Sequence, residues 1–112
     1  MPESSQRIFP RAEGEYVAWY QIADQGFHRC VALDIGIDGA CLRVLDPLPE
    51  GQSLEVSFQL TDDWLVRAAA NIIWQRPEDG EVLVGVRYRP VRSADRSLMG
   101  PWIHQQRRRL NS

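Results

Sequence analysis

The stretch "LDIGIDGACL", residues 33–42, is an apolar run interrupted by two aspartates and two glycines. Apolar, strand-forming residues on both sides of a short Asp- and Gly-containing segment predict two strands joined by a tight turn. A hairpin needs turn residues at its centre, but it does not need Asp34, which lies well before the turn. Two interpretations of Asp34 follow: its side chain caps the turn, or it points from the hairpin toward a ligand.

Similar strand-and-turn units extend in both directions from this hairpin. Runs rich in β-branched and aromatic residues alternate with segments containing Gly, Pro, Asp or Asn, at a spacing typical of small all-β domains. The predicted strands are residues 15–23, 27–35, 40–45, 52–60, 65–75 and 81–90.

Strict alternation along a strand assigns its residues to two faces. In the second strand it places Cys30, Ala32 and Asp34 on one face, opposite Val31, Leu33 and Ile35. In the fourth strand it directs Leu54, Val56 and Phe58 inward, and Glu55, Ser57 and Gln59 outward.

The last segment has a different period. Leu98, Trp102, Gln106 and Leu110 recur every four residues, which predicts a helix over residues 93–110. Six strands followed by one helix predict a mostly β fold, namely a six-stranded antiparallel barrel with a C-terminal helix. We expect residues 1–112 to form a single domain whose first 11 residues are a flexible segment.

Composition limits the classes of function. The chain contains no apolar run long enough to span a membrane and no apolar N-terminal signal, so we expect a cytoplasmic protein with no membrane partner. All 13 basic residues are arginine, yet the formal net charge is −2, which argues against binding to a nucleic acid polymer.

The sequence also lacks the usual signs of catalysis. His28 and His104 have no motif around them, and neither a phosphate-binding loop nor a metal-ligand spacing is present. Cys30 and Cys41 lie within predicted strands, where buried thiols are more common than a disulfide. We therefore expect a protein that is not an enzyme and has no cofactor or metal.

Arg7 and Arg11 form an R-x-x-x-R pair immediately before the first predicted strand. About one or two such pairs are expected by chance among 13 arginines, and Arg92 and Arg96 form a second one. The first pair differs from the second in its context, because it precedes the "DIGIDG" hairpin by two strands.

In this order the two motifs resemble the PilZ domain family, whose pattern is R-x-x-x-R followed by [DN]-x-S-x-x-G. The stretches "NIIWQRPEDGEVLVGVRY", residues 71–88, and "WIHQQRRRL", residues 102–110, are similar to the last two strands and the terminal helix of that family. The resemblance covers residues 6–110. It implies a six-stranded barrel and the binding of cyclic di-GMP, a bacterial second messenger.

The resemblance also implies roles for individual residues. Arg7 and Arg11 would donate to a guanine edge or a phosphate, and Asp34 would accept from guanine N–H groups. Gly39 would adopt a positive φ in the turn and allow the ligand to approach the backbone. Trp74 would stack on a base, or would instead be a core or barrel-end aromatic residue.

The sequence departs from the family pattern at Gly36, where the family has serine. Losing a hydroxyl contact to a charged group costs about 1.5–3 kcal/mol, unless the N–H of Gly36 or a water replaces it.

The leading hypothesis is a non-catalytic cyclic di-GMP receptor in which ligand binding orders the N-terminal segment and so presents a surface to an unidentified downstream protein. The family implies an output in motility, biofilm polysaccharide or virulence. The alternative is a ligand-independent protein-interaction adaptor with the same fold. A third hypothesis, a nucleic-acid-binding barrel, is disfavoured by the net charge.

Overall fold

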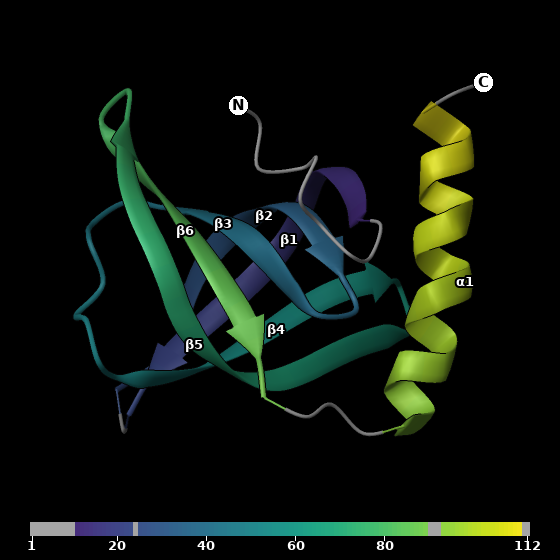
Figure 1. The fold of residues 1–112 in the computed structure, drawn as a ribbon, viewed down its shortest axis with the longest axis horizontal. Helices are drawn as coiled ribbons and strands as arrows, with labels where there is room; N and C mark the ends of the chain where they lie inside the picture. The colour runs from purple at the N-terminus through teal and green to yellow at the C-terminus, as the bar shows by residue number, and fades with distance from the viewer. Residues whose placement is uncertain (1–10, 24, 90–92, 111–112) are drawn as a thin grey trace.

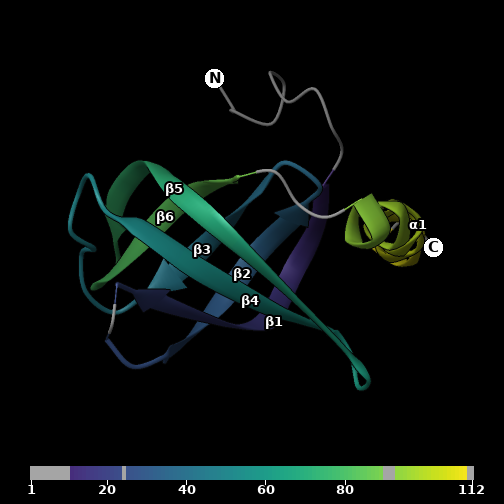
Figure 2. The same cartoon turned by 90° about the horizontal axis from the view of Figure 1, so that it is seen from below.

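The fold is an antiparallel barrel of six strands with one helix packed beside it (Figures 1 and 2). The computed structural model describes residues 11–23, 25–89 and 93–110. The strands close in the order β1-β2-β3-β6-β5-β4. This confirms the fold class predicted from the sequence. The elements are β1 (Arg11–Ile22), β2 (His28–Gly36), β3 (Gly39–Val44), β4 (Ser53–Thr61), β5 (Trp64–Glu78), β6 (Glu81–Tyr88) and α1 (Ser93–Leu110).

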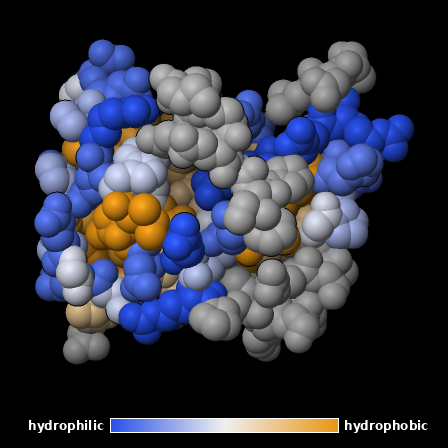
Figure 3. All heavy atoms as spheres, in the orientation of Figure 1, coloured by the Kyte–Doolittle hydropathy of each residue, from blue (hydrophilic) through white to orange (hydrophobic). Residues whose placement is uncertain are grey.

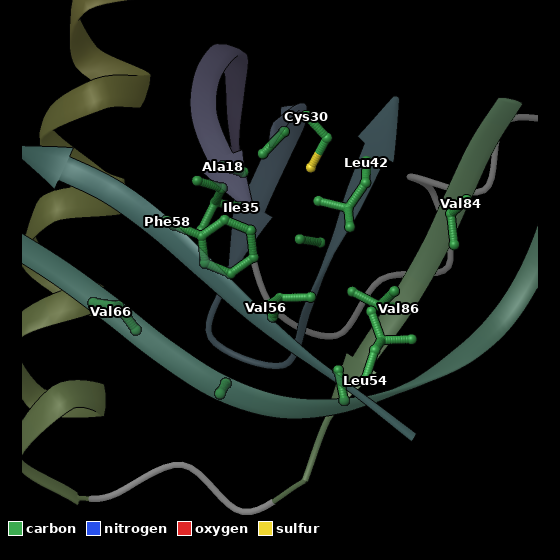
Figure 4. Close-up of a cluster of buried hydrophobic side chains, with 14 of the residues drawn as sticks. Ala18, Cys30, Ile35, Leu42, Leu54, Val56, Phe58, Val66, Val84 and Val86 are labelled. Carbon is green, nitrogen blue, oxygen red and sulfur yellow. The ribbon is translucent and has the colours of Figure 1, made fainter. Parts of the chain in front are cut away.

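The barrel interior is filled by alternate residues of all six strands (Figure 4). In β4, Leu54, Val56 and Phe58 point inward as predicted, and Phe58 is completely buried. Ser57 faces the other way, but it is only 3% exposed because side chains of neighbouring strands cover it. The predicted outward direction of Ser57 is therefore confirmed, although its side chain is covered.

The first strand begins earlier than predicted. Arg11 and Ala12 pair with Gly36 and Ile35 of β2, and Ala12 is completely buried in the core. Arg11 is therefore part of the barrel wall and not of a flexible segment, which corrects the predicted boundary. The polar residues and the glycine of "RAEGE" weaken the strand signal in the sequence, whereas pairing with β2 provides the missing backbone partners.

Four β-bulges or similar irregularities interrupt the alternation in the described strands. They fall between Glu13 and Tyr16 in β1, between Ala32 and Asp34 in β2, between Gln59 and Thr61 in β4, and between Ile72 and Trp74 in β5. A bulge places two residues of one strand opposite one residue of its partner, which reverses the faces beyond it. The predicted common face for Ala32 and Asp34 was wrong for this reason.

The β5–β6 hairpin follows the turn chemistry of its sequence. Glu78 pairs with Glu81, and the two residues between them, Asp79 and Gly80, have φ values of 51° and 83°. Positive φ at both central residues is the geometry of a type I′ turn, for which Asp-Gly is a preferred pair.

Helix α1 covers part of the barrel next to β1 and β2. Met99, Trp102 and Ile103 are buried in the common core. The indole Nε1 of Trp102 donates to the carbonyl oxygen of Leu60 at 3.2 Å, and its ring meets Tyr16 edge-on at 5.3 Å. The helix occupies the predicted range 93–110, and within the described residues no helix is both long and apolar enough to cross a membrane.

Candidate functional site

The predicted site residues that the structure describes lie together on the outer face of the barrel. Arg11 of β1 pairs with Gly36 of β2, Asp34 pairs with Cys41 of β3, and Gly39 pairs with Arg87 of β6. The inward residues between them are the fully buried Ala12, Ile35 and Ala40. Arg7 lies outside the described residues.

Bulges direct two of these side chains outward. Ala32 pairs with Leu42 inside the barrel, but the bulge at Leu33 brings Asp34 opposite Cys41, which faces out. In β5, Ile72 pairs with Val86 inside, and the bulge at Ile73 brings Trp74 opposite Gly85 on the outside. The barrel thus remains apolar inside while polar and aromatic groups gather on one part of its outer face.

Arg11 and Asp34 form the centre of the site. The Nη1 atom of Arg11 donates to Oδ1 of Asp34 at 2.9 Å, and the two side chains are 15% and 10% exposed. Burial alone would lower the pKa of Arg11, but the hydrogen bond to Asp34 and the charges of Asp34 and Asp38 outweigh it and raise that pKa above its ordinary value. Asp34 thus holds a permanently charged guanidinium at the surface of the barrel.

Gly39 has a different role from the one predicted. Its φ is not positive, so the turn does not require glycine at this position for conformational reasons. A Cβ atom at Gly39 would lie 2.2 Å from the backbone oxygen of Val86. Gly39 is therefore needed because β3 and β6 approach each other closely here, and the expected positive φ was wrong.

Gly36 leaves room for the side chain of Arg11. A Cβ atom at Gly36 would lie 2.7 Å from Cγ of Arg11 and 3.0 Å from Oδ1 of Asp38. The aliphatic part of Arg11 therefore crosses β2 directly over the bare backbone of Gly36, and its guanidinium reaches the two carboxylates beyond.

Trp74 is half-buried on the outer face and is not part of the core cluster. Its indole ring packs on Gly85, where a Cβ atom would lie 2.3 Å from the ring, and the guanidinium of Arg76 is 5.5 Å from the ring centroid. The interpretation of Trp74 as a core aromatic is thus excluded: its indole lies on the outer face, packed on Gly85 and with the guanidinium of Arg76 over its ring.

Asp38 and Tyr88 belong to the same cluster, although the sequence did not single them out. Asp38 Oδ2 lies 3.6 Å from Nη2 of Arg11, and the carbonyl oxygen of Asp38 accepts from the backbone N–H of Tyr88 at 2.9 Å. Burial raises the pKa of Tyr88, an effect that Arg11 opposes and that Asp38 and Asp34 increase. The only sequence signal was the second aspartate of "DIGIDG", which turn chemistry explained equally well.

Apolar side chains also reach the surface elsewhere. A groove of about 310 Å³ over β1, β4 and β5 is lined by Trp19, Phe27, Ser57, Gln59, Leu65 and Arg67. Phe27 is 48% exposed and carries the guanidinium of Arg67 at 5.6 Å from its ring centroid. Figure 3 shows a further compact group of hydrophobic residues among hydrophilic ones, on the side of the barrel away from α1.

The two cysteines and His28 are the other candidate chemical groups. Cys30 and Cys41 are buried thiols with no disulfide between them, and burial raises the pKa of Cys30 to about 12. His28 stacks on Tyr20, with ring centroids 5.1 Å apart. Among the described residues, no group of His, Cys, Asp or Glu side chains could hold a metal ion.

Comparison with known proteins supports this view of the fold. The family model of the PilZ domain matches residues 5–105. The PilZ domain of YcgR from Escherichia coli, solved with c-di-GMP, is 16% identical with a TM-score of 0.78, and the match covers 94% of each chain. The Bacillus subtilis inhibitor of motility (MotI/DgrA) is 17% identical with a TM-score of 0.78, over 95% of this chain and 52% of that one.

This chain therefore spans about half the length of MotI/DgrA, and the same holds for YcgR in complex with c-di-GMP from Escherichia coli, of which the match covers 48%. No curated protein sequence matches the chain significantly. At identities this low, the structural neighbours establish the fold alone.

Proposed function

Because this chain belongs to the PilZ domain family, we propose that it is a non-catalytic receptor for cyclic di-GMP. The proposed ligand site comprises Arg7, Arg11, the hairpin from Asp34 to Gly39, and Trp74. Two neighbours of the same fold were solved with c-di-GMP, which supports this choice of ligand.

The observation that carries the proposal is the pairing of Arg11 with Asp34 on the outer face, at 2.9 Å. A guanine base presents O6 and N7 acceptors next to N–H donors. The fork of an arginine fits the acceptors, and a carboxylate fits the donors. A guanine that contacts both side chains would therefore have each of its polar edges matched, which an adenine would not.

The proposed ligand also carries two phosphates. Arg11 is the only cation of the R-x-x-x-R pair within the described residues, and it is already paired with an aspartate. We propose that Arg7 supplies the second guanidinium, because an R-x-x-x-R spacing brings both arginines to one ligand when the segment before β1 folds over the hairpin. Trp74 would then stack on one base beside Gly85.

Such binding would also explain how the signal is transmitted. Residues 1–10 would acquire a fixed position against the barrel only when the ligand connects Arg7 to Asp34. The ordered segment and the bound nucleotide would together form a new surface for a downstream protein. Ordering has an entropic cost of about 1–2 kcal/mol per residue, which the contacts with the ligand must offset.

Isothermal titration calorimetry with cyclic di-GMP tests the proposal. We expect binding that weakens at least tenfold in Arg7→Ala, Arg11→Ala and Asp34→Ala, with Arg29→Ala as a control, because Arg29 is exposed on β2 opposite Trp19. Circular dichroism verifies that each variant is folded. Backbone amide signals of residues 1–12 should shift on titration. Absence of binding to the folded wild-type protein would refute the receptor function.

A second candidate function is a protein-interaction adaptor that acts without the nucleotide. The groove beside Trp19 favours it, because Phe27 and Leu65 are 48% and 46% exposed there. Apolar grooves with a charged rim are common features of protein-binding surfaces. This function would be favoured if folded protein gave no heat with cyclic di-GMP and if Leu65→Glu abolished its activity in cells.

A further inference from the structure

The guanidinium of Arg11 is shared by two carboxylates. Asp34 holds Nη1 at 2.9 Å, and Asp38 lies 3.6 Å from Nη2. In the proposed receptor, one carboxylate is enough to accept hydrogen bonds from the N–H groups of guanine, and Asp34 supplies it. The second carboxylate adds a negative charge at the place where an anionic ligand would have to bind.

The side chain of Asp38 lies next to the open space at Gly36. Oδ1 of Asp38 lies 3.0 Å from the point that a Cβ atom of residue 36 would occupy. The family pattern has serine at that position, and its side chain would press on both Asp38 and Arg11. The carboxylate of Asp38 thus lies beside the bare backbone of Gly36, and the backbone of Asp38 is held there by the 2.9 Å hydrogen bond from Tyr88.

The cluster is not fully satisfied in this arrangement. Nε of Arg11, Oδ1 of Asp38 and the hydroxyl of Tyr88 are buried and have no hydrogen-bond partner among the residues that the structure describes. Buried polar atoms are normally paired, and each unpaired one is unfavourable. Three unpaired atoms in one cluster leave the arrangement of Arg11 in the free protein incompletely satisfied, so a ligand that offers new hydrogen-bond partners can compete with it.

We infer that Asp38 is a further determinant of ligand affinity, which competes with the anionic ligand for Arg11 and holds the guanidinium down over Gly36 in the free protein. This inference rests on the proposed receptor function. Cyclic di-GMP would have to draw Arg11 away from Asp38 while leaving Asp34 to accept from the base. Asp38 therefore sets how much ligand is needed for occupancy.

The size of the effect follows from the exposure of the pair. The side chains of Arg11 and Asp38 are 15% and 31% exposed, and their charged atoms are 3.6 Å apart. An ion pair of this kind changes an equilibrium constant by at most about fivefold. Removing the charge of Asp38 should therefore strengthen binding of cyclic di-GMP roughly three- to fivefold, and most at low salt.

The experiment compares Asp38→Asn with Asp63→Asn in calorimetric titrations with cyclic di-GMP at two salt concentrations. Asp63 is exposed in the turn between β4 and β5, so its variant has the same net charge without touching the site. Stronger binding in Asp38→Asn alone supports the inference. Unchanged or weaker binding in that variant overturns it while the receptor function stands. No binding in wild type and variant overturns both.

A second measurement needs no ligand. A double-mutant cycle combines Arg11→Gln with Asp38→Asn and measures the unfolding equilibrium constant of each variant. The effect of the double mutant should differ from the product of the two single effects by a factor of about two to five. The cycle of Arg11→Gln with Asp63→Asn should give a factor of about one. A factor of about one for Arg11 and Asp38 would show that the carboxylate does not hold the guanidinium, which overturns the inference whatever the nucleotide does.

Discussion

Replacing Gly39 by alanine tests the close approach of β3 and β6, on which the geometry of the hairpin depends. The new Cβ would lie 2.2 Å from the backbone oxygen of Val86 and 3.2 Å from Cα of Arg87. Both atoms belong to the backbone of a central strand, so no side-chain rotation can relieve the overlap. The two strands would have to separate by about 1 Å to restore ordinary contact.

Alanine substitutions at three glycines separate the two causes of destabilisation, namely an unfavourable backbone φ and a lack of space for the Cβ atom. Gly39 lacks space but has an ordinary φ, Gly80 has a φ of 83° with open space around it, and Gly26 has neither restriction. Overpacking costs about 1–3 kcal/mol and sometimes more, and a rigid backbone neighbour places Gly39→Ala at about 3 kcal/mol. We expect about 1–2 kcal/mol for Gly80→Ala, and a change of less than about 1 kcal/mol, if any, for Gly26→Ala.

Urea unfolding followed by tryptophan fluorescence and circular dichroism measures these differences. Gly39→Ala should lower the unfolding midpoint most, with an unchanged dependence on urea if the denatured state is unaffected. It should also weaken cyclic di-GMP binding, because the displaced hairpin carries Asp34. If Gly39→Ala proved no more destabilising than Gly80→Ala, the reasoning from strand contact would be refuted.

Three further predictions concern other parts of the structure. Asp34→Asn should lower the free energy of unfolding by about 1–3 kcal/mol because it leaves Arg11 without its main partner. Urea unfolding should show this loss in the wild-type protein, and the same substitution should cause no loss in a protein that already carries Arg11→Gln. Gly85→Ala should push the indole of Trp74 off the barrel, since the new Cβ would lie 2.3 Å from the ring. The tryptophan fluorescence should then shift to the red, and this shift should be absent when Trp74→Phe is also present. The pKa of the Cys30 thiol is raised from 9.0 to about 12 in the folded protein, so the unfolded state releases its proton first. The contribution of Cys30 to stability should be intact below about pH 9 and should fall by about 1.4 kcal/mol per pH unit between about pH 9 and about pH 12. Unfolding measured as a function of pH should show this slope, and Cys30→Ala should reduce it.

The sequence determined the type of fold and predicted a group of residues that the fold brings together. Alternation in β4 and the Asp-Gly turn between β5 and β6 are local signals, because side-chain period and turn conformation depend on neighbouring residues alone. The order of R-x-x-x-R and "DIGIDG" likewise indicated that Arg11, Asp34 and Gly36 belong to one site, which the pairing of β1 with β2 brings together on one face.

Only the tertiary structure decided which way the site residues point. The bulge that turns Asp34 outward lies in the pairing of β2 with β3, and the alternation within β2 alone does not predict it. The role of Gly39 depends on its contact with Val86, which is 47 residues away along the chain. The ion pair between Arg11 and Asp38 depends on the path of the Arg11 side chain across the bare backbone of Gly36. These are contacts between segments distant in sequence, so their distances are set by how the barrel closes.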